Sequence, residues 1–76
     1  MVDELKIGGI YEHYKGKRYL VKDVARHSES LELMVVYECL YENPLGKMWI
    51  RPLQMFQEKI EIDGRVLARF RLVDTN

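Results

Sequence analysis

The segment EKIEIDGRVLARFRL, residues 58–72, decides the fold class. On both sides of Asp63-Gly64, apolar and polar residues alternate with the period of two that is typical of a half-buried strand. An Asp-Gly pair between two such runs is the strongest short signal for a β-hairpin, because both residues tolerate the positive φ angles of a type I′ turn. The segment therefore predicts two antiparallel strands, over residues 58–62 and 66–72. In the second strand, we expect Phe70 and Leu72 to face the core and Arg69 and Arg71 to face solvent.

Short apolar runs broken by turn residues continue through the rest of the chain. Four further strands are predicted, over residues 10–14, 18–27, 33–42 and 47–51. The segment PLQMFQE, residues 52–58, does not alternate, and its leading proline favours a single helical turn. Five or six short antiparallel strands with one helical turn predict an all-β fold, a small and partly open SH3-like β-barrel.

Length and cysteine content limit the class of protein. A chain of 76 residues has room for one domain, which we expect over residues 9–73 after an N-terminal tail at residues 1–8. Cys39 is the only cysteine, so the chain cannot form an internal disulfide. A lone thiol, no signal peptide and apolar runs too short to cross a bilayer predict a cytoplasmic location without membrane contact.

Positive and negative charges balance overall but are segregated along the chain. The sequence has 12 basic and 12 acidic residues; bases dominate residues 13–27, whereas residues 28–46 carry glutamates and no base. The neutral total argues against binding of polyanions through many basic contacts. It leaves room for a local anion site built from a few arginines.

The segregated charges also suggest how the second and third predicted strands pair. If Lys22 lies opposite Glu38, the charges of the two strands become cross-strand partners and their apolar residues face one another. The same register places Cys39 opposite Val21. We therefore expect Cys39 to be a small buried hydrophobic residue rather than a nucleophile.

The segment ARHSES, residues 25–30, contains four chemically versatile side chains in a row: Arg26, His27, Ser28 and Glu29. Consecutive strand residues point to opposite faces, so the row does not assemble a Ser-His-carboxylate triad within a strand. The histidines and the cysteine lack the spacing of a known zinc motif, and we assign no catalytic residue, metal ligand or cofactor. Two interpretations stay open: the polar tip of a hairpin with local hydrogen bonds, or a recognition surface.

Several separated motifs, read together, resemble the small bacterial proteins called domain of unknown function 1653. The motif residues are Tyr11, His13 to Gly16, Ala25 to Glu29, Val35 to Tyr37, Leu40, Tyr41, Trp49, Arg51, Pro52, Phe56, Gly64, Arg69 and Phe70. The resemblance extends from residue 9 to about residue 72, with Ser30 and Ala68 as mild departures. It implies an SH3-type barrel and no assigned activity.

Small barrels of this type usually bind a partner in a groove lined by aromatic side chains, and Tyr11, Tyr14, Tyr19, Tyr37, Tyr41 and Trp49 are available for such a surface. Trp49 has the same strand parity as Arg51, so the two side chains share a face. If Met48 and Ile50 are core, that face is exposed and suits cation–π capture of a ligand. The candidate ligand-binding residues are Tyr11, His13, Tyr14, Arg26, His27, Ser28, Glu29, Tyr37, Trp49, Arg51 and Arg69.

Three functional hypotheses follow. The first is a binding module for an anionic or planar partner, such as single-stranded nucleic acid or a nucleotide. The second is a protein–protein adapter or a homo-oligomeric interaction domain that uses the same aromatic residues, and we expect the chain to be a monomer or a weak homo-oligomer. The third and weakest is a hydrolytic enzyme that uses His27 and Glu29.

Overall fold

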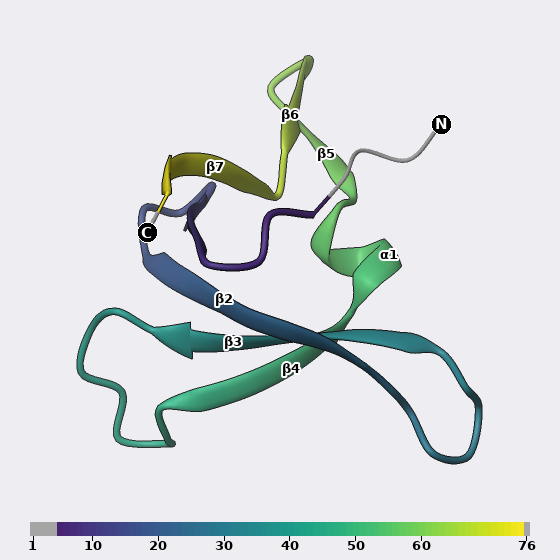
Figure 1. The fold of residues 1–76 in the computed structure, drawn as a ribbon. Helices are drawn as coiled ribbons and strands as arrows, with labels where there is room; N and C mark the ends of the chain where they lie inside the picture. Colours follow the sequence, from purple (N-terminus) through teal and green to yellow (C-terminus); the bar gives the residue numbers. More distant parts are fainter. Residues whose placement is uncertain (1–4, 76) are drawn as a thin grey trace.

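The computed structural model describes residues 5–75, and this part of the chain contains seven strands and one short helix (Figure 1). In chain order these are β1 (Gly9–His13), β2 (Arg18–Arg26), β3 (Leu33–Cys39), β4 (Met48–Pro52), α1 (Leu53–Phe56), β5 (Lys59–Ile62), β6 (Arg65–Ala68) and β7 (Phe70–Thr75). The predicted all-β fold with one helical turn is confirmed. No helix in the described part of the chain is long and apolar enough to cross a membrane.

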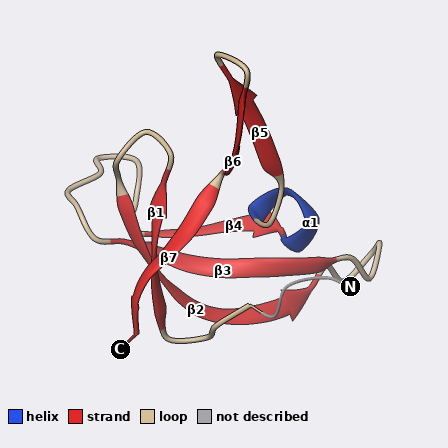
Figure 2. Ribbon diagram, turned by 90° about the horizontal axis from the view of Figure 1, so that it is seen from above, coloured by secondary structure: helices blue, strands red, loops and turns tan. Residues whose placement is uncertain are grey.

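The strands form two antiparallel sheets. Five of them follow the order β4-β3-β2-β1-β7, and β5 pairs only with β6. The β5–β6 hairpin projects from the body of the larger sheet (Figures 1 and 2). The larger sheet curls around the core without closing, because β4 and β7 each keep one unpaired edge.

The hairpin predicted around Asp63-Gly64 is present, with φ angles of 52° and 79° at these two residues. The strand that follows is shorter than predicted, because Arg69 separates β6 from β7. Its N–H donates to the Glu58 carbonyl at 3.0 Å, and its carbonyl accepts the Tyr14 N–H at 2.9 Å. This break gives seven strands instead of six.

The break also changes which side chains of the predicted second strand face the core. Phe70 is buried as expected, whereas Leu72 is 45 % exposed. Arg69 was expected to face solvent, but its side chain is only 23 % exposed. In a continuous strand, buried and exposed side chains would alternate from Arg69 to Leu72. The bend at Arg69 interrupts this alternation.

The predicted register between β2 and β3 is wrong. Val21 lies opposite Tyr37 rather than Cys39, and beyond Lys22 the register shifts by one residue at a β-bulge. The turn sets this register: the His27 N–H donates to the Glu32 carbonyl at 2.8 Å and closes the hairpin. The predicted charge pair forms nevertheless, because Lys22 Nζ lies 3.6 Å from Glu38 Oε1.

The core is aromatic at its centre. Its buried members are Tyr11, Val21, Val35, Tyr37, Phe56 and Phe70. The Phe56 ring, supplied by α1, stacks on the Phe70 ring at 4.0 Å between centroids. Cys39 is 5 % exposed, so its predicted burial is confirmed.

The described part of the predicted N-terminal tail lies against this core. Leu5 packs on the buried cluster, and the Lys6 N–H donates to the Tyr11 hydroxyl at 3.0 Å. Residues 1–4 lie outside the described residues.

Candidate aromatic and arginine-lined site

A hollow of about 170 Å³ lies on the inner side of the sheet, where β2, β3 and β4 run side by side. Its lining residues are Tyr19, Tyr37, Tyr41, Asn43, Trp49 and Arg51. The strand register explains the convergence: Trp49 lies opposite Tyr37 across β3 and β4, and Tyr19 lies opposite Cys39 across β2 and β3. The hollow is therefore aromatic on most sides, with one guanidinium in its wall.

Three rings form a continuous series beside this hollow, which we call the ring row: Phe70, Tyr19 and Tyr41. The Tyr19 centroid lies 5.7 Å from that of Phe70 and 5.5 Å from that of Tyr41, and both pairs meet edge to face. The hydroxyls of Tyr19 and Tyr41 are hydrogen-bonded at 2.9 Å. Burial and this hydrogen bond raise the pKa of the Tyr19 phenol well above its ordinary value, so the middle ring of the row is uncharged at neutral pH.

A cation lies at each end of the ring row. The Arg51 guanidinium carbon is 5.2 Å from the centroid of the Phe70 ring, and Lys17 Nζ is 4.7 Å from the centroid of the Tyr41 ring. Both distances are within the range of a cation–π contact. Within residues 5–75, neither side chain forms an ion pair with a carboxylate. Their positive charges are therefore available to an external anion.

The imidazole of His13 lies at the Arg51 end of the row. Its ring is 4.9 Å from the Phe70 ring and 4.4 Å from the Tyr14 ring. Burial lowers the pKa of His13, and the nearby charges of Arg51, Arg69 and Lys15 lower it further. Arg69 is paired with Glu58, whereas Arg51 and Lys15 have no carboxylate partner within residues 5–75, so unpaired positive charge lies at this end of the row.

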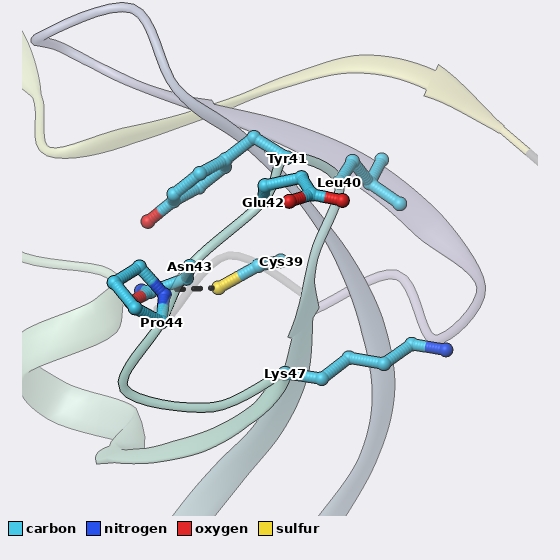
Figure 3. A pocket seen from close by; sticks show the side chains of 7 residues that line it. All are labelled: Cys39, Leu40, Tyr41, Glu42, Asn43, Pro44 and Lys47. Atoms are coloured by element: carbon cyan, nitrogen blue, oxygen red, sulfur yellow. Dashed lines mark hydrogen bonds between the residues drawn. The ribbon is translucent and has the colours of Figure 1, made fainter.

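A second, wider hollow has a volume of about 560 Å³, and Figure 3 shows the side chains that line it. It is formed by the β3–β4 loop and lined by Cys39, Leu40, Tyr41, Glu42, Asn43, Pro44 and Lys47. Tyr41 and Asn43 line both hollows, so the two spaces share one wall. The amide nitrogen of Asn43 lies 3.8 Å from the Cys39 sulfur, which holds this wall in place (Figure 3).

Comparison with known proteins identifies the family. Residues 9–72 match the family described as protein of unknown function DUF1653. The chain belongs to the DUF1653 family. A crystal structure of a DUF1653 protein from Bordetella bronchiseptica is 32% identical in sequence and superposes with a TM-score of 0.88, covering 100% of this chain and 96% of that one. No curated protein matches the chain.

In this DUF1653 domain Trp49 and Arg51 share a face, as their strand parity predicts. That face is the inner one, because Met48 and Ile50 are 50% and 61% exposed. The indole is half-buried, and its N–H donates to the Gly46 carbonyl at 3.0 Å. The condition for an exposed Trp49 and Arg51 face, that Met48 and Ile50 are core, is therefore not met, and Trp49 instead helps to form the hollow.

The residues of the ARHSES row lie apart from the hollow, at the tip of the β2–β3 hairpin. The Arg26 guanidinium donates to the Leu31 carbonyl at 2.9 Å. His27 Nδ1 accepts the backbone N–H groups of Glu29 and Ser30 at 3.1 Å and 3.3 Å. The contacts of the arginine and the histidine are thus those of a structural hairpin tip, and neither residue lines the hollow.

The other candidate residues are distributed between the core and the site. Tyr11 is buried against Phe56, with 5.4 Å between ring centroids. Arg69 Nη2 lies 3.5 Å from Glu58 Oε1, and its Nε is buried without a hydrogen-bond partner in the described structure. The structure therefore brings together His13, Tyr14, Tyr37, Trp49 and Arg51, with Arg69 nearby. It does not bring Ser28 or Glu29 to them.

The sequence contains no signal that places Lys17 and Asn43 in or beside the hollow, and it suggests Tyr19 and Tyr41 only as available aromatic residues, outside the candidate set. Tyr19 has the strand parity of the buried Val21, which is a usable signal for the inner face. Tyr41 and Asn43 lie in an irregular loop, where parity gives no information. Among residues 5–75, no three His, Cys, Asp or Glu side chains lie close enough to hold a metal ion.

Proposed function

We propose that this DUF1653 protein is a binding module that takes a planar, anionic partner, such as a nucleotide or a segment of single-stranded nucleic acid, in the hollow beside the ring row. The observation that carries the proposal is the Arg51 guanidinium, half-buried against the Phe70 ring with no carboxylate partner in the described structure. A charged group in such a place is expected to have a counter-ion, and within residues 5–75 no carboxylate pairs with Arg51.

The chemistry of the lining suits this class of partner. Aromatic walls stack with planar groups and exclude water from them. A guanidinium binds phosphate oxygens through two parallel hydrogen bonds, which fixes the orientation of the ligand. Tyr37 and Trp49 supply the apolar walls, and Arg51 supplies the donor.

The test is a fluorescence titration, because Trp49 is the only tryptophan and lines the hollow. Nucleoside monophosphates and short oligonucleotides should quench or shift its emission, and Arg51→Ala should weaken binding by roughly 1–3 kcal/mol, the scale of a hydrogen bond to a charged group. Arg65→Ala is the matched control, since Arg65 is exposed on the β5–β6 hairpin, away from the hollow. The proposal is wrong if no nucleotide binds, or if both arginine variants behave alike.

Arg26→Ala belongs in the same experiment, since the sequence alone placed Arg26 in the site. We expect its affinity to equal that of the unmodified protein, because its guanidinium binds the Leu31 carbonyl at the hairpin tip. A loss as large as that of Arg51→Ala would instead extend the binding surface to the tip.

A second candidate function is supported by the outer face of the sheet. Met48 and Ile50 are exposed there on β4, which is an edge strand. Exposed apolar side chains on an unpaired edge favour association with another protein chain. A mass that rises with concentration in solution, and that falls with Ile50→Lys, would support a homo-oligomer or adapter. For either function we propose a bacterial source, as for the similar protein from Bordetella bronchiseptica, and a cytoplasmic location, since Cys39 is the only cysteine.

A further inference from the structure

The two ends of the ring row carry separate positive charges, and this arrangement bears on the size of the partner. Arg51 contacts the Phe70 ring at one end, and Lys17 contacts the Tyr41 ring at the other, with Tyr19 between them. A mononucleotide carries its phosphate on one side of its base only. A nucleotide within a strand carries a phosphate on both sides, and so matches a row with a cation at each end.

The sizes of the two hollows also favour a partner longer than one nucleotide. The inner hollow of about 170 Å³ has room for little more than one ring system. Beyond the shared wall of Tyr41 and Asn43 lies the wider hollow of about 560 Å³, which one nucleotide held at Arg51 leaves unfilled. A ligand that continues past Tyr41 would use both spaces.

Acidic residues near the second hollow limit the extent of the positively charged surface. Glu38 is neutralised by Lys22 and Lys47, whose Nζ atoms lie 3.6 Å and 3.3 Å from its carboxylate oxygens. Glu42 lines the wider hollow and is exposed. The positive potential is therefore confined to the row itself, and a strand would be held over a short length rather than along an extended basic face.

We propose, on the basis of the function proposed above, that the partner is a single strand of nucleic acid and that the site engages at least two consecutive nucleotides. One phosphate contacts Arg51 and another contacts Lys17, while the base between them lies against Tyr19 and Tyr41. Aromatic platforms flanked by cations hold single strands with little sequence preference. We therefore expect the site to respond to strand length more than to base identity.

The test compares thymidine monophosphate with thymidylate dimers and hexamers, using Trp49 emission and calorimetry. The dimer should bind more tightly than the monomer, and the hexamer should add little more. Lys17→Ala should weaken the hexamer about twofold to fivefold, the range of an exposed ion pair, and leave the monomer unchanged. For the hexamer, the slope of log affinity against log salt concentration should be less steep in Lys17→Ala than in the unmodified protein. The difference should be about 0.7, the value for one phosphate contact to a single strand.

The controls separate this inference from the function on which it rests. Arg51→Ala should weaken all three ligands, and Lys59→Ala, which removes an exposed lysine on β5, should weaken none. If the monomer binds as tightly as the hexamer, or if Lys17→Ala leaves the hexamer unaffected, the length inference is wrong and the binding function stands. If none of the three ligands binds, the proposed function itself is wrong.

Discussion

The tip of the β2–β3 hairpin takes its polar groups from one continuous stretch, residues 26–32, whereas the ring row takes its rings from β2, β7 and the β3–β4 loop. At the tip, the side chains of His27 and Arg26 form hydrogen bonds with backbone groups that are no more than five residues away in sequence. In the row, Tyr19 contacts Tyr41 and Phe70, which are far from it in sequence.

The comparison shows that side chains which stand out in the sequence are not always the ones that are free to bind a ligand. The tip is the most suggestive motif in the sequence, yet its arginine and its Nδ1 lone pair are already used to close a turn. Arg51 and Lys17 beside the ring row contact ring faces, and neither has a carboxylate partner in the described structure. A binding site needs the second condition, and only the fold provides it.

The largest expected effect is that of removing a ring from the buried end of the row. Phe70 stacks on Phe56 at 4.0 Å and is 6% exposed, so Phe70→Ala leaves a cavity and should lower the free energy of unfolding by about 3–5 kcal/mol. That loss is comparable with the whole stability of a domain of this size, so Phe70→Leu serves as the milder variant. Urea denaturation measures both.

Val66→Ala is the control for this comparison, because Val66 is 67% exposed on the projecting β5–β6 hairpin. It should change the free energy of unfolding by no more than about 0.5 kcal/mol, as surface substitutions usually do. If Phe70→Ala lowers the free energy of unfolding by less than Val66→Ala does, the row does not belong to the cooperative core.

The next effect is smaller and local to the hairpin tip. His27→Ala removes the acceptor for the Glu29 and Ser30 N–H groups and should lower the free energy of unfolding by about 1 kcal/mol. Hydrogen exchange at these two amides should accelerate, while nucleotide affinity stays unchanged. His27→Asn should restore part of the protection, since its side-chain oxygen can accept the same donors. Unchanged exchange in His27→Ala would contradict the structural role of the imidazole.

Much of the fold could be predicted because local signals agree with it. The Asp63-Gly64 turn and the helical turn after Pro52 both follow from residue chemistry, and both are present. The break at Arg69 could not be predicted, because it depends on hydrogen bonds to Glu58 and Tyr14, which come from other parts of the fold. The β2–β3 register failed for a related reason: the closure of the turn at His27, rather than charge pairing, decides it.

The candidate site was predictable only in part. Strand parity correctly placed Trp49 and Arg51 on one face, but it could not say which face is inward until the pairing of Trp49 with Tyr37 was known. Tyr41 and Asn43 reach the hollow from a loop, where no periodicity exists. Arg26 was included because it stands beside a histidine in sequence, and the hairpin places it elsewhere.

The smallest expected effect is the pH dependence that His13 gives to stability. Burial and the charges of Arg51, Arg69 and Lys15 hold the pKa of His13 below its ordinary value of 6.5 in the folded protein. The unfolded chain therefore takes up this proton first as the pH falls, so stability should decline gradually from just above pH 6.5 downward and level off below the folded pKa. The lowered pKa of Glu12, which binds Arg18 and Arg71, adds its own loss only below about pH 4.5, so the two windows are separate.

Urea midpoints between pH 7.5 and 5.5 test this effect, with His13→Asn as the variant that lacks it. The variant should show a flatter profile than the unmodified protein, and the difference should be smaller than the loss in His27→Ala, because the imidazole is only partly buried.

An oligonucleotide held at Arg51 would bring negative charge to the same imidazole and favour its protonated form. Binding of the oligonucleotide should then strengthen as the pH falls through the same window, and His13→Asn should remove that gain. Identical pH profiles for the two proteins, with and without oligonucleotide, would mean that His13 does not sense the charge at this end of the row.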